Sequence, residues 1–191
     1  MKIHLQTPQE MRPQIWKELG RASQDRHHEW RTPVLASIDA DGWPDARTVV
    51  LRQVDALAGQ LTFYTDSRSP KVPQLQAQAQ AMLVFWSARL GWQLRVRVVC
   101  TVITAGPEVE TLWQGIKQSA SAGDYLSLLP PGAVLLQDSS TPEAETADGL
   151  TPAHHFAVLH AQVLQMDWLE LSREGHRRAQ LSATTWEWLT P

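Results

Sequence analysis

The sequence predicts a mainly β fold, an antiparallel and Greek-key-like β-barrel with flanking helices, built as a single domain over residues 1–191. Two observations lead to this prediction. Six or more segments rich in β-branched and aromatic residues recur at close spacing, and turn signals such as Asp-Ala-Asp-Gly at 39–42 separate them. Helical periodicity is confined to a few short segments. Many antiparallel strands with few helices are typical of a β-barrel or a sandwich.

An N-terminal helix is expected over residues 8–22. Met11, Ile15 and Leu19 recur every four residues and therefore share one helical face. Pro13 is expected to limit where this helix starts, because proline lacks the backbone N–H that a helix interior uses. The apolar face predicts that the helix covers the sheet.

The remaining elements follow from local patterns. A short helix is predicted with Ser69 as its N-cap and Pro70 in its first helical position, and another over 106–118. Residues 130–152 are rich in Pro, Gly, Ser, Thr and acidic residues, which predicts a mobile surface loop. The expected strands cover residues 32–39, 46–55, 59–67, 81–87, 92–104, 154–171, 176–183 and 185–189.

Composition excludes several classes of protein. A net charge of -3 and a pI near 6.1 give no general attraction to nucleic acid or to an anionic membrane. No segment approaches about 18 consecutive apolar residues and the first residues carry no signal-peptide pattern, so a cytoplasmic protein without membrane contact is expected. Cys100 is the only cysteine, so no intrachain disulfide is possible. The histidine pairs 27–28 and 154–155 lack metal-site spacing, and no metal is expected.

The segment ARTVVLRQVD, residues 46–55, carries an arginine at each end of an apolar run. Side chains alternate along a regular strand, so Arg47 and Arg52 would face opposite sides. Either a bulge re-aims one of them, or the two contact different parts of an extended ligand or different subunits. The remaining alternative is that both lie at strand ends and extend into water.

A second group of polar residues favours a ligand. Tyr64 and Thr65 end a predicted strand, Arg68 follows in the loop, and Lys71 lies in the first turn of the next helix. A lysine there opposes the helix dipole unless an anion is bound, and unpaired N–H groups at a helix start favour anions. This pattern predicts an anion site.

A third group lies on the segment WQLRVRV, residues 92–98. Alternation places Gln93, Arg95 and Arg97 on one face and apolar residues on the other, which must be core. Three or four charge-assisted hydrogen bonds contribute about 1.5–3 kcal/mol each, while association itself costs several kcal/mol. Tight binding therefore needs a flat ring as well as a phosphate, so the expected ligand is a phosphorylated aromatic cofactor.

Three ordered motifs resemble the FMN-binding split barrel of the pyridoxamine 5'-phosphate oxidase family, in its oxidase-like branch: ARTVVLRQVD, LTFYTDSRSPKVPQL and AMLVFWSARLGWQLRVRV. The resemblance covers about residues 30–104 closely and resumes more weakly over 156–188. It implies FMN as the cofactor, a homodimer with flavin at the subunit interface, and redox chemistry on a small molecule.

The resemblance also implies site residues. Arg47 stands where the family grips the flavin phosphate, and Arg52 replaces the lysine that closes the same motif. Pro70 stands where the family has an arginine, and Arg68 is the candidate to replace it. The implied cofactor-binding set is Arg47, Thr48, Val49, Val50, Leu51, Arg52, Tyr64, Thr65, Arg68, Lys71, Arg178 and, from the other subunit, Gln93.

Some positions depart from the family pattern. Leu112 and Ile116 stand where authentic oxidases hold the substrate phosphate with a tyrosine and an arginine. Of a late Arg-x-His pair only His176 remains. These departures argue against activity on pyridoxamine 5'-phosphate and leave Arg52 and His176 as the candidate catalytic residues.

The leading hypothesis is an FMN-dependent oxidoreductase acting on an unidentified small molecule. The alternative is a flavin-binding protein without turnover, which would serve storage or sensing. Binding of single-stranded nucleic acid to the basic strands is disfavoured, because the net charge is negative and no aromatic residues lie between the arginines of the RVRV segment.

Overall fold

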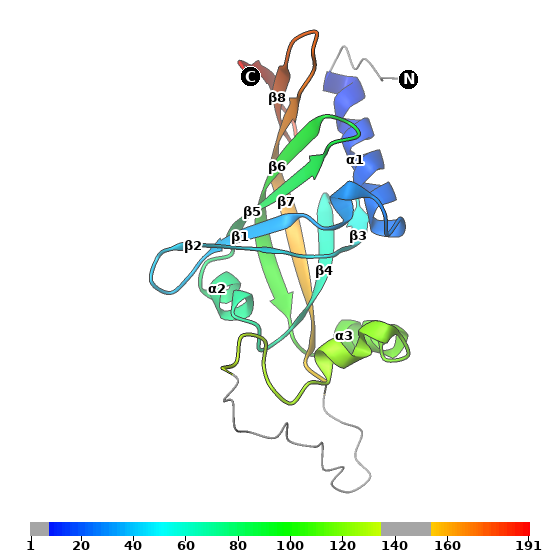
Figure 1. The fold of residues 1–191 in the computed structure, drawn as a ribbon, viewed down its shortest axis with the longest axis vertical. Coiled ribbons are helices and arrows are strands. Elements are labelled where there is room, and N and C mark those ends of the chain that lie inside the picture. Colours follow the sequence, from blue (N-terminus) through cyan, green and yellow to red (C-terminus); the bar gives the residue numbers. More distant parts are fainter. Residues whose placement is uncertain (1–7, 135–153) are drawn as a thin grey trace, which may run out of the picture.

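The computed structural model describes residues 8–134 and 154–191 (Figure 1). Much of the loop predicted over 130–152 lies outside these residues. The described helices are α1 (Pro8–Gln24), α2 (Lys71–Ala77) and α3 (Pro107–Ile116), with 3-10 turns η1 (Glu29–Arg31) and η2 (Ala120–Tyr125). The described strands are β1 (Val34–Ile38), β2 (Pro44–Thr48), β3 (Leu51–Asp55), β4 (Gln60–Asp66), β5 (Gln80–Ser87), β6 (Trp92–Ile103), β7 (Phe156–Glu170), β8 (Arg177–Ser182) and β9 (Trp186–Leu189).

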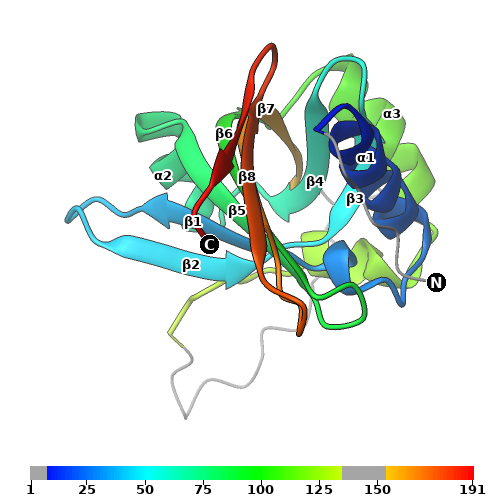
Figure 2. The same ribbon diagram turned by 90° about the horizontal axis from the view of Figure 1, so that it is seen from above.

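These strands form one sheet in which neighbouring strands are antiparallel, in the order β2-β1-β5-β6-β7-β4-β3. Strands β2 and β3 stand at opposite ends of this order, yet only Val49 and Val50 separate them in the chain. The sheet must therefore curl until its two ends meet, as Figure 2 shows from above. The predicted mainly β barrel with flanking helices is confirmed.

The barrel is split along β7, the longest strand. Residues 156–162 of β7 pair with β4, whereas residues 165–170 pair with β8, which in turn pairs with β9. The register of β7 against β6 shifts between these two halves, with Leu164 as the extra residue. A bulge bends a strand, so the two halves of β7 belong to differently directed parts of the sheet.

The segment 46–55, predicted as one strand, is two strands. The chain leaves β2 after Thr48 and enters β3 at Leu51, because the barrel closes there. In β3 the register against β4 shifts between Leu51 and Gln53, so Arg52 is a bulge residue. Of the alternatives for the two arginines, a bulge that re-aims one of them is the observed arrangement.

Helix α1 covers the barrel as its sequence pattern predicts. Met11, Ile15 and Leu19 are fully buried in the main core. The expected limit at Pro13 is wrong, because the helix begins at Pro8 and contains Pro13. A smaller apolar cluster lies between α3, η2 and the outer side of β4 and β7.

Helix α2 differs from its predicted start. Ser69 is not its N-cap: the cap position is Pro70, without a side-chain cap hydrogen bond, and the helix has 7 residues. Such a short helix makes a weak anion site by itself, so any anion site here depends on side chains. No helix among the described residues is long and apolar enough to span a membrane.

Candidate cofactor site

Arg47 lies at the centre of a polar network between β1, β2 and α2. Its guanidinium donates to Ser37 Oγ at 2.6 Å and to Gln74 Oε1 at 3.0 Å. It also forms an ion pair with Asp45. Gln74 completes the network, because its amide accepts from Ser37 Oγ at 2.7 Å and donates to Asp45 at 2.8 Å. The Arg47 side chain is thereby held in one position with 20% of its surface exposed.

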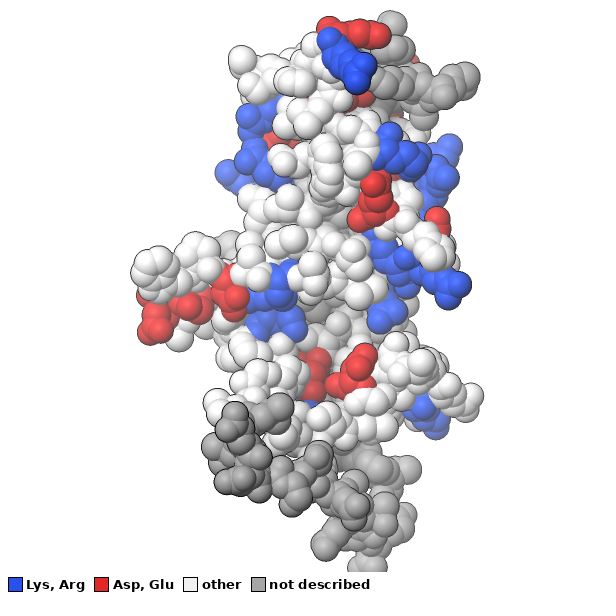
Figure 3. Space-filling view, in the orientation of Figure 1, with Lys and Arg blue, Asp and Glu red and all other residues white. Residues whose placement is uncertain are grey.

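Asp45 brings a negative charge into this network. The hydrogen bond from Gln74, opposed by partial burial and helped by the charge of Arg47, holds the pKa of Asp45 below its ordinary value. The carboxylate is therefore ionised at neutral pH. In Figure 3 acidic side chains follow the projecting β1–β2 hairpin, and basic side chains adjoin them at its base.

Lys71, at the start of α2, lies beside this network. Its ammonium donates to Thr65 Oγ1 at 2.9 Å and to Ser69 Oγ at 2.6 Å, and both acceptors are neutral. Burial, followed by the positive charge of Arg47, lowers the pKa of Lys71. We call Ser37, Asp45, Arg47, Thr65, Ser69, Lys71 and Gln74 the β2–α2 cluster.

Four members of this cluster were not predicted as site residues, and one of them, Ser69, was predicted only as the N-cap of the helix. Asp45 shares a strand face with Arg47, and Ser37 is paired opposite Asp45 in the β1–β2 register, so the hairpin pattern could have indicated both. Gln74 reaches the cluster only because α2 packs beside β1. Nothing in its local sequence signals this contact.

Arg52 lies away from this cluster, on the outer side of β4. Its guanidinium carbon is 5.5 Å from the centre of the Tyr64 ring, and its buried Nε has no hydrogen-bond partner among the described residues. Burial raises the pKa values of Tyr64 and of Tyr125 on η2, while the charge of Arg52 acts in the opposite direction on both. The Arg52 guanidinium therefore lies near two neutral phenols, those of Tyr64 and Tyr125, and its Nε–H is left as an unused hydrogen-bond donor.

Arg68 has partners of its own. Its guanidinium donates to Asp66 at 2.7 Å and to the backbone carbonyls of Ser127 and Leu128 at 2.9 and 3.2 Å. Burial raises the pKa of Asp66, but the side-chain and backbone hydrogen bonds from Arg68 outweigh it and keep this pKa below its ordinary value. Arg68 therefore fastens the segment after η2 to the end of β4, and its role as a replacement at Pro70 stays a prediction.

The predicted residues of the later strands form a separate group on the outer face of β6, β7 and β8. The alternation of β6 is as predicted, with Leu94 and Val96 buried and Arg95 outward. Arg95 and Arg178 both pair with Asp167; Arg178 does so through two hydrogen bonds, at 3.0 and 2.8 Å. We call Gln93, Arg95, Asp167 and Arg178 the outer-face cluster.

Asp167 stabilises this cluster as a shared counter-ion. Hydrogen bonds from Arg178 and Arg95 overcome the effect of burial and lower the pKa of Asp167. Two guanidinium groups share one carboxylate, so the cluster keeps a net positive charge. Within residues 8–134 and 154–191, the buried Nε of Arg95 has no hydrogen-bond partner. A positive cluster with a spare donor can accept an anionic or carbonyl-bearing ligand.

His176 lies in the turn between β7 and β8, where its Nδ1 accepts from the backbone N–H of Ser172 at 3.2 Å. Figure 1 shows this turn at the top of the molecule, well above α2, which lies beside the base of the β1–β2 hairpin. One copy of the chain therefore does not bring His176 together with Arg47 and Lys71.

Comparison with known proteins decides the family. Residues 13–104 match the family model described as the FMN-binding domain of pyridoxamine 5'-phosphate oxidase. These residues form an FMN-binding domain of that family. The predicted family is confirmed, and so is the cofactor of the family, FMN.

Curated relatives of this FMN-binding domain carry the name pyridoxine/pyridoxamine 5'-phosphate oxidase. The one from Paracoccus denitrificans is 36% identical over 81 residues, which are 41% of this chain and 37% of the relative. The one from Thermosynechococcus vestitus is 44% identical over 62 residues, 32% of this chain and 28% of the relative. The chain thus matches well under half the length of these relatives.

Solved structures show the same fold over the whole chain. An FMN-binding protein of Nostoc punctiforme, related to pyridoxamine 5'-phosphate oxidase, has a TM-score of 0.70 and 24% identity, covering 97% of this chain and 98% of its own. PhzG from Burkholderia lata 383, solved with tetrahydrophenazine-1-carboxylic acid, also has a TM-score of 0.70, with 16% identity and full coverage of both chains.

The β2–α2 cluster of this FMN-binding domain fits a phosphate group. Arg47 and Lys71 are close enough for one charge to lower the pKa of the other, and Lys71 donates to neutral hydroxyls. An anion between them would relieve this repulsion and accept hydrogen bonds from both. Asp45 is the one member that opposes such an anion.

Four further residues implied for FMN, Thr48 to Leu51, follow Arg47 directly in the chain. Thr48 ends β2, Val49 and Val50 form the link at the barrel closure, and Leu51 is buried at the start of β3. The backbone of Val49 is fixed by a hydrogen bond of 3.0 Å to the carbonyl of Pro33. The link is therefore a rigid stretch of backbone.

Proposed function

We propose that this chain is an FMN-dependent oxidoreductase that acts on a small molecule. The observation that supports the proposal most directly is the pair of cations, Arg47 and Lys71, held beside each other with neutral hydroxyl partners on Lys71. When bound, FMN supplies the redox chemistry, and the protein supplies binding, orientation and electrostatics.

In this proposal the β2–α2 cluster binds the FMN phosphate. Arg47 and Lys71 donate charge-assisted hydrogen bonds, and the hydroxyl groups of Thr65 and Ser69 keep the lysine ammonium in place. Ser37 and Gln74 orient the guanidinium. The phosphate displaces Asp45 as the charged partner of Arg47, so binding exchanges one anion for another.

Arg52 acts at the other end of the cofactor. Its Nε lacks a hydrogen-bond partner and its guanidinium is fixed on the Tyr64 ring. A preorganised donor of this kind stabilises negative charge on a flavin ring or on a substrate without reorganising. Leu112 and Ile116 of α3 are partly buried apolar residues here. They offer no charge to a substrate phosphate, so the substrate is a molecule other than a phosphate ester.

The complete site requires a second copy of the chain. Gln93 and Arg178 lie on the outer face of the sheet, whereas the register places Arg47 on the same face as the buried Leu35, Leu83 and Val96, so one copy does not bring the two groups together. The same outer face carries Trp86, opposite Gln93 in the register, with 46% of its surface exposed. A homodimer in which this face covers the partner's FMN would bring the two groups together.

The first experiment is the visible absorption spectrum of the purified protein, recorded before and after FMN is added and excess FMN is removed by desalting. Flavin bands that remain with the protein are expected. A protein that retains no flavin, and binds none at tens of micromolar FMN, would overturn the proposal.

Anaerobic mixing of the flavin-loaded protein with NADH, NADPH or candidate amines tests the redox part separately. Bleaching of the flavin bands by one of these donors supports an oxidoreductase. Bound flavin that none of a broad donor panel reduces would instead support the non-catalytic alternative, in which the chain stores or senses flavin.

A further inference from the structure

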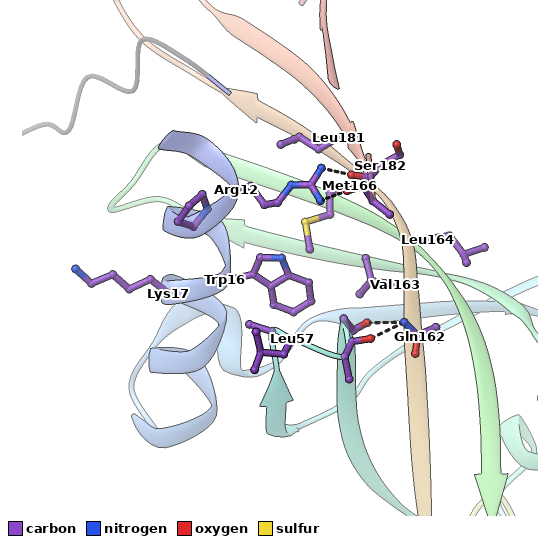
Figure 4. Close-up of a pocket in the computed structure, with 15 residues that line it drawn as sticks. Arg12, Trp16, Lys17, Leu57, Gln162, Val163, Leu164, Met166, Leu181 and Ser182 are labelled. Atoms are coloured by element: carbon purple, nitrogen blue, oxygen red, sulfur yellow. Dashed lines mark hydrogen bonds between the residues drawn. The ribbon is translucent and has the colours of Figure 1, made fainter. Parts of the chain in front are cut away.

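A cavity of about 660 Å³ lies between α1 and the sheet, away from the β2–α2 cluster (Figure 4). The turn between β3 and β4 and residues of β7 and β8 complete its walls. Its apolar lining includes Trp16, Leu57, Val163, Leu164, Met166 and Leu181. No residue proposed for FMN lines this cavity.

The cavity exists because α1 is tied down on both sides of it. Arg12 donates to the carbonyl of Ala183 at 2.8 Å and to that of Ser182, which fastens the start of α1 beyond β8. Near the other end, buried Glu18 bonds His28 Nε2 at 3.0 Å. The helix is therefore held on both sides of the stretch that lines the cavity, while its apolar face packs in the core.

The bulge in β7 contributes the other half of the opening. Leu164 is the extra residue at the register shift, and 51% of its surface is exposed at the rim. Val163 and Met166 on either side of the bulge face the cavity, opposite the indole of Trp16 (Figure 4). An aromatic wall faces an aliphatic and thioether wall, an arrangement that suits a flat ring.

Two of the polar side chains of the lining, those of Arg12 and Gln162, are already paired. Both terminal nitrogens of Arg12 donate to backbone carbonyls. Gln162 Nε2 donates to the carbonyls of Ala58 and Gly59 at 2.8 and 3.2 Å. Lys17 points away from the cavity in Figure 4. A charged ligand inside the cavity would find Arg12 and Gln162 already paired and the Lys17 ammonium directed outward, so the lining favours an uncharged molecule.

We propose that this cavity is a second binding site, for a neutral planar aromatic molecule of two or three fused or linked rings. Ligand pockets range over about 300–1,000 Å³ and are mainly apolar with a few polar groups. A cavity of about 660 Å³ is larger than a single ring requires. The carbonyl of Ala58 accepts one hydrogen bond, from Gln162, and can accept one more, so a ring-bound N–H or O–H would be recognised there.

The test uses N-phenyl-1-naphthylamine, a neutral aromatic amine whose fluorescence rises in apolar sites, titrated into the full chain loaded with FMN. Saturable binding of one probe per chain is expected, with the FMN bands unchanged. Trp16→Leu, which removes the aromatic wall, and Leu164→Glu, which places a charge at the rim, are each expected to weaken binding by roughly tenfold or more.

Leu128→Glu is the matched control, because Leu128 is 55% exposed and lies outside the cavity lining. It is expected to leave probe binding unchanged. Thermal melts verify that each variant is folded, and Leu164→Glu decides the question where Trp16→Leu does not fold. Absence of saturable binding, equal affinity in wild type and Leu164→Glu, or release of FMN by the probe would each overturn the proposal.

Sedimentation of the same proteins separates a ligand site from a contact between chains. Leu164→Glu is expected to sediment like wild type. A change from a larger to a smaller species would show that a second copy of the chain covers the cavity, and the ligand proposal would then be wrong.

Discussion

At the scale of single residues, the charges around Arg47 determine what the β2–α2 cluster can bind. The positive charges of Arg47 and Lys71 favour a bound anion. The ionised Asp45 already forms an ion pair with the Arg47 guanidinium and so competes with that anion. Three substitutions separate these contributions: Arg47→Ala, Asp45→Asn and Lys71→Arg. The first two each remove one charge, the third removes a side chain that loses its proton in alkaline solution, and none of them changes the buried core.

Arg47→Ala is expected to weaken FMN binding by about 1.5–3 kcal/mol, the contribution of a hydrogen bond to a charged group. Fluorescence quenching of FMN during titration measures this affinity. Arg26→Ala serves as the control, because Arg26 is an exposed arginine outside the cluster. Equal FMN affinity in Arg47→Ala and wild type would show that the phosphate assignment is wrong.

Asp45→Asn is expected to strengthen FMN binding by about 0.5–1 kcal/mol, the size of a partly exposed charge interaction. The amide can still accept from Gln74 and Arg47 but does not repel the phosphate. Because the pKa of Asp45 is lowered, the difference from wild type should be the same at every pH above about 5. Weaker binding would mean that the negative charge is needed to position Arg47.

FMN affinity is also expected to fall in alkaline solution. Burial and the charge of Arg47 lower the pKa of Lys71, so it loses its proton below the ordinary lysine value of about 10.4. A bound phosphate stabilises the charged ammonium, so affinity is full below the lowered pKa and declines as pH rises through it. The dissociation constant measured over about pH 7.5–10 tests this.

Lys71→Arg provides the contrast, because arginine stays charged over the whole range. Its affinity profile is expected to be flat. If the variant and wild type declined in parallel, another group would be responsible.

At the scale of elements, bulges and turns direct side chains that a regular strand would place elsewhere. The bulge at Arg52 aims its guanidinium across the Tyr64 ring, and the bulge at Leu164 opens the cavity beside α1. The turn before β6 depends on Gly91, which has a φ of +68° and packs against the end of β7.

Gly91→Ala is expected to destabilise the fold by about 1–3 kcal/mol, because a Cβ there would lie 2.8 Å from the carbonyl oxygen of Leu171 and the backbone favours glycine. Gly20→Ala is the matched control. Gly20 lies inside α1, a Cβ there meets nothing within 4 Å, and a gain of about 0.5–1 kcal/mol is expected. Urea denaturation measures both, and equal stabilities would contradict the close approach at Gly91.

At the scale of the whole molecule, Arg47 and the outer-face cluster lie on opposite faces of the sheet within one copy. The β2–α2 cluster is near the base of the β1–β2 hairpin, whereas the outer-face cluster lies on β6, β7 and β8 (Figure 1). Both groups can act on one FMN only if two chains combine, so association and flavin binding should depend on each other.

Trp86→Glu is expected to weaken both association and FMN binding, since exposed tryptophans at an interface commonly contribute about 2 kcal/mol or more. Trp188→Glu is the control, because Trp188 is 43% exposed, close to the 46% of Trp86, but is paired opposite the buried Ala179 and so lies on the other sheet face. Sedimentation velocity and FMN titration measure the two properties. Loss of FMN binding without loss of association would contradict the shared site.

The sequence by itself determined the periodic features of this protein. The helix through Met11, Ile15 and Leu19 and the alternation of β6 follow from residues that are neighbours in the chain. The local pattern of a strand followed by a helix start predicted an anion site at Lys71, and the resemblance to the family added Arg47 to it; both assignments stay predictions.

Only the tertiary structure decided which side chains meet across the fold. It divided residues 46–55 between two edges of a closed barrel, placed Gln74 on Arg47, and gave Arg178 the carboxylate of Asp167. It also opened the cavity under α1 through Arg12 and Ser182, which are 170 positions apart. The physical reason is that backbone periodicity depends on near neighbours, whereas ion pairs, bulges and cavities depend on how distant segments pack.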